Sequence, residues 1–216
     1  MTPLEALSNG AGAILKRPLS AHERDDFGKY LSLLLKWQKA HRLVGSSDPM
    51  WIVEHLFLDS LLFLKLLPSS VRSLGDVGSG AGLPGLPIKI VRREIDVVLI
   101  ESRRRRAMFL TSAIRVMKLG GARVAEGRVE SLGAELGGRL DAVVMRCAGD
   151  VEEMIPAAAA LVSEHGIVVA SGPPKARPLS IGEWATVPGV RPGSSRRFAV
   201  YRPLGSRRSP GHSDAH

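Results

Sequence analysis

Hydrophobic positions early in the chain recur with the 3.6-residue period of an α-helix. One such pattern runs over residues 21–41, and a second, ended by Pro68, runs over residues 50–67. These two predicted helices form a helical extension over residues 21–69. We expect residues 1–20, which precede them, to be weakly structured.

From about residue 71 onward, short apolar runs alternate with helical stretches, which is the signature of a parallel sheet built from βαβ units. The predicted strands are Ser73–Val77, Asp96–Glu101, Ala122–Ala125, Asp141–Arg146 and Ile167–Ser171. Helices are predicted on both faces of this sheet. They cover residues 84–92, 103–119 and 151–164, with a short turn near 130–136.

Two further extended segments, Ala185–Val190 and Arg197–Arg202, are joined by a connection too short for a crossover helix. We therefore predict an antiparallel hairpin at one edge of the sheet. The fold class is α/β: a mostly parallel, Rossmann-like seven-stranded sheet with an antiparallel edge hairpin and an amino-terminal helical extension. We expect a single domain over residues 21–204, with its Rossmann-like core over 70–204, and a disordered tail over 205–216.

The composition is that of a globular protein, since 44% of the 216 residues are hydrophobic and 24% are charged. The most apolar stretch, residues 51–67, carries charges and is too short to span a bilayer, so we expect no membrane association. No secretory signal is visible, and the single Cys147 cannot form an internal disulfide, which favours a cytoplasmic location. The six histidines lack metal-ligand spacing, so we expect no metal, and we expect a monomer.

The charge balance favours a polyanionic partner. The net charge is +9 and the sequence pI is about 10.3, and each phosphate that a basic side chain neutralises releases condensed counterions. RNA is such a partner. The predicted phosphate contacts come from the helical extension, from the start of the helix after the second strand, and from the edge hairpin: Lys36, Lys39, Arg42, Arg103, Arg196 and Arg197.

Four glycines, Gly78, Gly80, Gly82 and Gly85, follow the first predicted strand and open the next helix. Glycine weakens regular structure by about 0.5–1 kcal/mol per residue, so this cluster indicates a backbone that turns tightly or approaches a ligand closely. In an open parallel sheet the ligand lies beyond the carboxyl ends of the strands. The alternative is a tight turn with close helix packing and no ligand.

The segment Gly80–Gly85 matches the G-x-G-x-x-G fingerprint of dinucleotide sites, which by itself does not identify the nucleotide. The preceding Asp76–Gly78, the absence of a Tyr-x-x-x-Lys pair and the lack of length for a substrate domain argue against a dehydrogenase. Glu101 ends the second strand, where an acid can accept hydrogen bonds from both ribose hydroxyls of an adenosine. Alternatively, Glu101 is neutralised by the arginines that follow it.

Several segments together resemble the bacterial 16S rRNA guanine-N7 methyltransferase family (glucose-inhibited division protein B). The resemblance covers residues 25–203, and it is carried by His55–Ser60, Asp76–Pro87, Arg105–Leu110, Arg128–Glu130 and Asp141–Ala148. It implies a class I methyltransferase fold, S-adenosyl-L-methionine as cofactor, and 16S rRNA or the small ribosomal subunit as partner. The implied reaction is methylation of guanine 527 at N7, in a loop of the decoding region.

On matching positions, the resemblance implies that Gly78 and Leu83 line the methyl-donor site and that Val129 and Glu130 lie near the adenine. It implies that Arg146 borders the donor and the target base as a positioning residue. Arg146 would then bind guanine O6 or the donor carboxylate, and a structural salt bridge to Asp150 or Asp141 is the alternative. The complete predicted donor set is Asp76, Gly78, Gly80, Gly82, Leu83, Glu101, Val129, Glu130 and Arg146.

Guanine N7 has a free lone pair and no proton to remove, so the absence of an obvious general base fits this chemistry. We expect the target guanine to lie in a loop or to be splayed out of its stack. His55 and Asp59 stand four residues apart on a predicted helix. We expect them to close the carboxyl edge of the sheet over the cofactor, and a histidine satisfied within the core is the alternative.

The chain departs from the family pattern at three places. Arg42–Val44 stands where Asn-Leu-Thr is usual, Ser171-Gly172 stands where Lys-Gly is usual, and Cys147 stands where an alanine is more common. Two other functions therefore stay open at this level. One is a methyltransferase that acts on another RNA base, and the other is a ribosome-assembly protein that binds RNA and S-adenosylmethionine without turnover.

Overall fold

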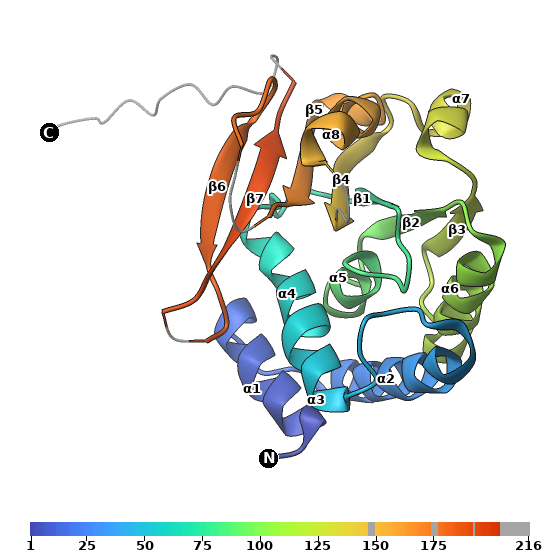
Figure 1. The fold of residues 1–216 in the computed structure, drawn as a ribbon, viewed down its shortest axis with the longest axis vertical. Coiled ribbons are helices and arrows are strands. Elements are labelled where there is room, and N and C mark those ends of the chain that lie inside the picture. Colours follow the sequence, from blue (N-terminus) through green and yellow to red (C-terminus); the bar gives the residue numbers. More distant parts are fainter. Residues whose placement is uncertain (147–149, 174–176, 192, 204–216) are drawn as a thin grey trace, which may run out of the picture.

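A computed structural model of the chain describes residues 1–146, 150–173, 177–191 and 193–203. The predicted tail over residues 205–216 and Cys147 lie outside the described residues. Seven strands form one sheet in the order β3-β2-β1-β4-β5-β7-β6 (Figure 1). They are β1 Ser73–Val77, β2 Asp96–Glu101, β3 Ala122–Glu126, β4 Leu140–Arg146, β5 Val162–Ser171, β6 Glu183–Pro188 and β7 Ser195–Tyr201.

Strands β1 to β5 run parallel, and β7 pairs antiparallel with both β5 and β6. The predicted mixed sheet with a reversed hairpin at one edge is therefore confirmed. The strand order reverses direction at β1, which pairs with β2 on one side and with β4 on the other. Such a topological switch point is where open α/β sheets bind their ligands, at the carboxyl ends of the strands.

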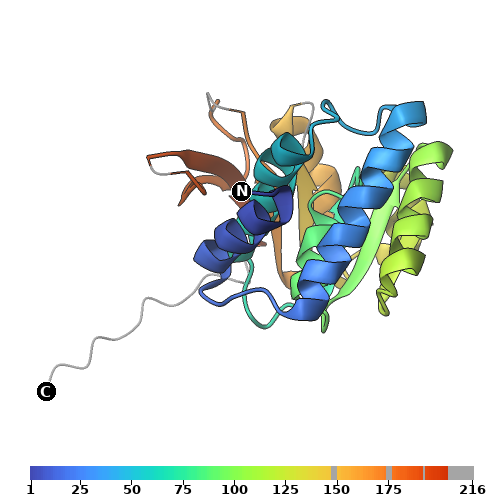
Figure 2. The ribbon, with the colours of Figure 1, turned by 90° about the horizontal axis from the view of Figure 1, so that it is seen from below.

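The two faces of the sheet are covered unequally. Alternate strand residues belong to different hydrophobic clusters, so that Val97 and Leu99 pack in one cluster while Val98 and Ile100 pack in the other. The larger cluster lies under most of the helices, and α2 and α6 lie side by side there (Figure 2). Its helices are α1 Pro3–Leu15, α2 Ala21–His41, α3 Pro49–Ile52, α4 Leu58–Leu61, α5 Gly85–Val91 and α6 Arg104–Met117. The smaller cluster contains residues of the 3-10 turn η3 Val129–Leu132, α7 Gly133–Leu136 and α8 Val151–Ala159.

The expectation of a weakly structured segment over residues 1–20 is wrong, because α1 is a complete helix. Thr2 and Glu5 form a reciprocal capping box at its start, and Pro3 occupies the first helical position. The face of α1 that contains Leu7 is buried in the larger cluster. Its Gly10 comes so close to α4 that an added Cβ would lie 2.5 Å from Leu58 Cδ1.

The predicted regular helix over residues 50–67 is also wrong in detail. The segment begins as α3, widens into a π-helix over Val53–Phe57 (η1), continues as α4 and ends as a 3-10 turn over Leu62–Lys65 (η2). At the end of η1, the amide of Leu58 donates to the carbonyl of Val53, five residues earlier. π-Helical turns are rare and occur frequently at functional sites. In the described part of the chain, no helix is both long and apolar enough to cross a bilayer.

The predicted helix over residues 151–164 ends too late. Helix α8 stops at Ala159, three residues after Pro156, whose ring cannot donate a backbone hydrogen bond. Strand β5 then starts at Val162, five residues before the predicted start, because Val162 pairs with Leu140 across a register shift in the ladder to β4. In the edge hairpin, β6 lies two residues earlier than predicted, and β7 starts two residues and ends one residue earlier than predicted.

Candidate functional site

The loop between β1 and α5 is held in a conformation that requires glycine. Gly78, Gly80 and Gly82 have φ angles of +69°, +58° and +87°, in the left-handed region that residues with a Cβ rarely adopt. Gly78 is exposed, and a Cβ built on it would meet nothing within 4 Å. At Gly82, by contrast, a Cβ would lie 2.3 Å from Leu86 Cδ1. Gly78 is therefore where a ligand can approach the loop backbone, whereas Gly82 allows close packing of helix α5.

Asp76 supports this loop from beneath. Its carboxyl group is completely buried, and its Oδ2 accepts a hydrogen bond of 3.0 Å from the amide of Gly85 at the start of α5. Its Oδ1 is buried without a hydrogen-bond partner among the described residues. Burial, which disfavours the charged form, raises the pKa of Asp76 to about 7. Asp76, which we predicted to contact the methyl donor, thus lies under the loop and holds strand β1 to helix α5.

Glu101 fastens the other side of the loop. Its Oε2 accepts a hydrogen bond of 2.8 Å from the amide of Gly80, and its Oε1 accepts one of 2.8 Å from the amide of Arg103. The carboxylate is satisfied by backbone amides, and no salt bridge to a neighbouring arginine is found among the described residues. A carboxylate has about four lone-pair positions, so two stay available for a ligand hydroxyl.

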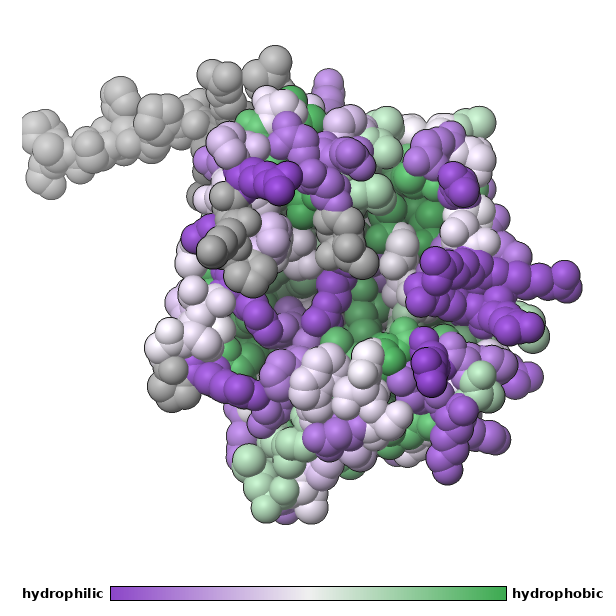
Figure 3. Space-filling model, viewed as in Figure 1, coloured by the Kyte–Doolittle hydropathy of each residue, from purple (hydrophilic) through white to green (hydrophobic). Residues whose placement is uncertain are grey.

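Val129 and Glu130 follow the end of β3 and begin the turn η3. Val129 packs into the smaller hydrophobic cluster, whereas Glu130 is exposed. Leu83, the remaining predicted donor residue, is buried in the larger cluster. The carboxyl ends of β1, β2, β3 and β4 thus bring the predicted donor residues to one edge of the sheet. Figure 3 shows hydrophobic groups at the bottom of a hollow on this side of the molecule, bordered by hydrophilic side chains.

Arg146, at the end of β4, reaches toward the π-helical segment. Its Nη2 donates a hydrogen bond of 2.7 Å to the carbonyl of His55 and lies 3.9 Å from Asp59 Oδ2. Its Nη1 is buried and has no hydrogen-bond partner among the described residues. The salt bridge to Asp141 or Asp150 that we considered is not formed. Instead, Asp141 accepts backbone hydrogen bonds at the start of β1, and Asp150 caps α8.

Arg146 lines a pocket of about 180 Å³, which we call the β4 pocket. Two aromatic rings, Phe63 and Phe198, pack edge to face at its wall, with centroids 4.8 Å apart. In the lining of the pocket, Arg196 forms two hydrogen bonds with Asp59, of 3.1 and 2.6 Å. The pocket is lined by Asp59, Ser60, Phe63, Arg146, Ser171, Gly172, Arg196, Arg197 and Phe198.

The predicted phosphate contacts fall into three places. Arg196 and Arg197 line the β4 pocket, whereas the exposed Lys36 lies in a shallow groove between α2 and α6. Lys39, Arg42 and Arg103 line a depression of about 540 Å³, here called the basic depression. It lies between the end of α2 and the start of α6, and it is lined by Lys39, Ala40, His41, Arg42, Leu43 and Arg103 to Arg106.

A group that could hold a metal ion lies on α2, where the sequence predicted none. His22, Asp25 and Asp26 bring their ligand atoms within 4.8 Å of one another. Their carboxylates already bind cations, because Lys29 lies 2.5 Å from Asp25 and Arg93 forms an ion pair with Asp26. The pair of Asp26 with Arg93 connects α2 to the segment that precedes β2.

Three contacts of the site could not be predicted from the sequence. The hydroxyl of the buried Tyr30 donates to the carbonyl of Ala81 in the glycine loop, across a separation of 51 residues. The Arg196 pair with Asp59 spans 137 residues. The contact of Arg146 with the His55 carbonyl spans 91 residues. No local sequence pattern predicts such pairs, because only the folded topology brings the two residues of each pair together.

Comparisons with known proteins agree with this geometry. Residues 23–173 match the family described as GidB, rRNA small subunit methyltransferase G. The protein named ribosomal RNA small subunit methyltransferase G from Xanthomonas euvesicatoria is 39% identical over 132 residues, which cover 59% of this chain and 61% of that protein. The protein of the same name from Sorangium cellulosum is 36% identical over 172 residues, 78% of this chain and 72% of that protein.

The aligned part of the chain thus spans 61% of the length of the Xanthomonas relative, less than two thirds. Among solved structures, the yhhF protein of Escherichia coli superimposes with a TM-score of 0.52 at 21% identity. That superposition covers 68% of this chain and 84% of the other. It shows the same fold.

The buried Asp76 carboxyl makes stability depend on pH. Because its folded pKa of about 7 exceeds the value near 4 of an unfolded chain, the folded state binds the proton more tightly between these values. The free energy of unfolding should therefore fall as the pH rises from 4 to 7 and then level off. Asp76→Asn should remove a decline of about 4 kcal/mol from this profile.

Urea unfolding at a series of pH values measures both profiles. Glu126→Gln, at an exposed carboxylate on β3, is the control and should keep the wild-type profile. Equal pH dependence in Asp76→Asn and wild type would contradict the assignment.

Proposed function

Because the chain belongs to the family of rRNA small subunit methyltransferase G, we propose that it transfers a methyl group from S-adenosylmethionine to guanine N7 of 16S rRNA, in the guanine 527 class. The observation that carries the proposal is that the glycine loop, Glu101 and the β4 pocket lie at the carboxyl ends of the neighbouring parallel strands β1, β2 and β4. Such an arrangement suits a donor and an acceptor that must meet. We propose a cytoplasmic site of action on the small subunit or its RNA.

The glycine loop and Glu101 fit an adenosylmethionine ligand. The open side of Gly78 lets a ligand reach the loop backbone, and the spare lone pairs of Glu101 can accept hydrogen bonds from the two ribose hydroxyls. We assign Val129 and Glu130 to the adenine side and Arg146 to the methyl side. S-Adenosylmethionine, when bound, supplies a methyl group on a sulfonium that a nucleophile can displace.

Arg146 is the residue that we assign to the target base. Guanine presents O6 and N7 as neighbouring acceptors on one edge. The guanidinium of Arg146, which lines the β4 pocket, can donate to O6, which leaves N7 open toward the methyl group. Asp59 and the carbonyl of His55 hold the guanidinium in place. Since the N7 lone pair carries no proton, this role needs orientation and no general base.

One assay tests the proposal and separates it from its alternatives. The chain is incubated with labelled S-adenosylmethionine and unmodified small subunits or 16S rRNA, and N7-methylguanine is mapped by strand cleavage at the alkali-labile site. We expect label at guanine 527. Label on a different base would reject the acceptor, and donor binding without incorporation would instead support a ribosome-assembly protein.

Arg146→Ala should lower the rate of methyl incorporation by about 100-fold, because one oriented hydrogen-bond donor is removed from the reacting base. Single-turnover kinetics with saturating donor measure the effect. Arg139→Ala, at an exposed arginine just before β4, is the matched control and should retain the wild-type rate. A full rate in Arg146→Ala would remove this residue from the mechanism.

Glu101→Gln should weaken donor binding by about 10- to 100-fold, because hydrogen bonds to a charged acceptor contribute about 1.5–3 kcal/mol. Isothermal titration with S-adenosylmethionine measures the affinity. Thermal unfolding of the same variant reports whether the bonds to Gly80 and Arg103 survive in the amide. An unchanged affinity in a folded variant would contradict ribose recognition by Glu101.

The basic depression should act as a phosphate surface. Lys39→Ala with Arg42→Ala removes two cations, so the slope of log affinity against log salt for 16S rRNA should become shallower by about 1.5 to 2. Filter binding over a salt series measures the slope. The paired control, Arg115→Ala with Arg139→Ala, removes two exposed arginines that do not line the depression and should keep the slope.

A further inference from the structure

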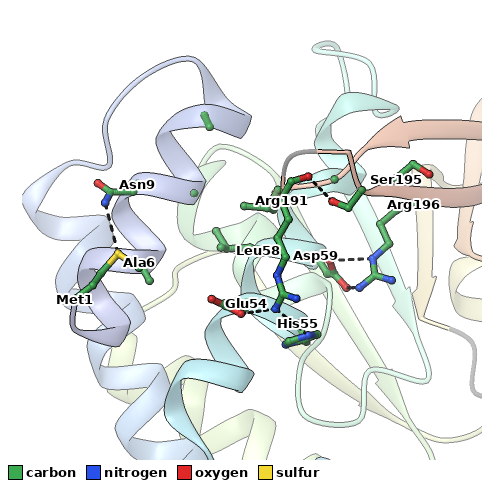
Figure 4. Close-up of a pocket in the computed structure, with 15 residues that line it drawn as sticks. Met1, Ala6, Asn9, Glu54, His55, Leu58, Asp59, Arg191, Ser195 and Arg196 are labelled. Carbon is green, nitrogen blue, oxygen red and sulfur yellow. Dashed lines mark hydrogen bonds and ion pairs between the residues drawn. The ribbon is translucent and has the colours of Figure 1, made fainter.

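A second cavity lies next to the β4 pocket and is not used by the proposed reaction. Its volume is about 630 Å³, and it lies between α1, the helical segment α3 to α4 and the turn that joins β6 to β7 (Figure 4). We call it the α1 cavity. Asp59 and Arg196 line both the α1 cavity and the β4 pocket, so their bidentate ion pair forms the wall between the two.

The α1 cavity has the size and lining of a ligand site. Pockets that hold small molecules measure about 300–1,000 Å³ and combine apolar walls with a few polar groups. Here the apolar lining comes from Ala6 and Leu58 on the helices and from Val190 on the hairpin turn. Polar groups of Asn9 and Ser195 add hydrogen-bonding positions on opposite sides.

Charged groups of the α1 cavity are matched in pairs. Arg191 reaches from the hairpin turn to Glu54, at 2.5 Å, and to the ring of His55, at 3.3 Å (Figure 4). Arg196 is paired with Asp59 in the same way. Because each guanidinium already has a carboxylate, the cavity offers little net charge to a lone phosphate and favours a neutral group with hydrogen-bonding edges.

Flat surfaces are also present. The ring of His55 stacks on Trp51, with centroids 4.8 Å apart and an interplanar angle of 13°, and the guanidinium of Arg191 lies beside that ring. Unpaired RNA bases are recognised by stacking on aromatic rings and on arginine planes, together with hydrogen bonds to their edges. A nucleobase fits within the volume of the cavity and matches its neutrality and its flat surfaces.

We propose that the α1 cavity receives a second unpaired base of the RNA, a neighbour of the guanine held in the β4 pocket. The inference rests on the proposed function and extends it, because it names a second base that the enzyme must read. Two bases on one strand would then enter two adjoining pockets, with the ion pair of Asp59 and Arg196 between them. Recognition of a loop with two splayed bases follows from this arrangement.

The test is a double-mutant cycle that combines a protein variant with a filled cavity and an RNA that lacks one base. Ala13 is exposed on α1 and lines the cavity, so Ala13→Trp adds bulk there without disturbing the core. Ser8→Trp, on the same helix but outside the cavity, is the matched control. The RNA is a short loop that contains the target guanine, intact or with an abasic nucleotide at one neighbouring position at a time, and its affinity is measured by fluorescence anisotropy.

We expect one abasic position to weaken binding to the wild type about tenfold, in line with the loss of one stacked base. Ala13→Trp should weaken binding of intact RNA about as much and should show no further loss with that abasic RNA. Ser8→Trp should behave as the wild type. The inference is overturned if the loss of affinity from Ala13→Trp adds to the loss from the abasic nucleotide at every position of the RNA. Wild-type affinity of Ala13→Trp for intact RNA would also overturn it.

Two further measurements keep the outcome decisive. Ser195→Ala, which truncates an exposed polar group of the cavity, repeats the cycle if Ala13→Trp does not fold, and it should lose part of the affinity only for RNA that keeps the critical base. Anisotropy needs no turnover, so it is separate from the methylation assay. A wild type that does not methylate RNA rejects the proposed function, whereas additivity in the binding cycle rejects the second base site.

Discussion

The site depends on two carboxyl groups that hold the glycine loop to the ends of neighbouring strands. Asp76 binds the amide of Gly85, and Glu101 binds the amide of Gly80, so the loop is fixed both within its length and at its junction with α5. A loop with three residues in the left-handed region loses much conformational entropy on folding. These hydrogen bonds to buried acceptors offset that cost, and they present the backbone at Gly78 in one arrangement.

The helical extension also helps to hold the glycine loop. Tyr30 of α2 stacks on Phe57 of the π-helical segment, with ring centroids 4.7 Å apart, while its hydroxyl binds the loop at Ala81. One side chain thereby connects the extension, the glycine loop and the segment that carries His55 and Asp59. The extension and the sheet share one hydrophobic cluster. Residues that precede the first strand are consequently part of the site.

Patterns within short stretches predicted much of this molecule. The seven strands, the edge hairpin, the glycine loop and the position of Glu101 follow from apolar periodicity and from glycines placed after a strand. Helix α1 was missed because Gly10 and Gly12 disfavour an isolated helix, whereas in the fold Leu7 and its neighbours are stabilised by packing against α4. The partners of Arg146 were missed for a different reason. They come from a segment 91 residues away, and only the topology of the sheet brings the two together.

The π-helical turn over Val53–Phe57 gives the site an unusual sensitivity to chain length. A π-helix accommodates one more residue per turn than an α-helix does, and each residue of an α-helix rotates the chain by about 100°. Deletion of one residue within this turn would let the helix relax to the regular form, and residues of the turn such as His55 would shift relative to Asp59 and Arg146. Insertion or loss of a single residue, without any substitution, is thus a route by which evolution could dismantle or rebuild the wall between two pockets.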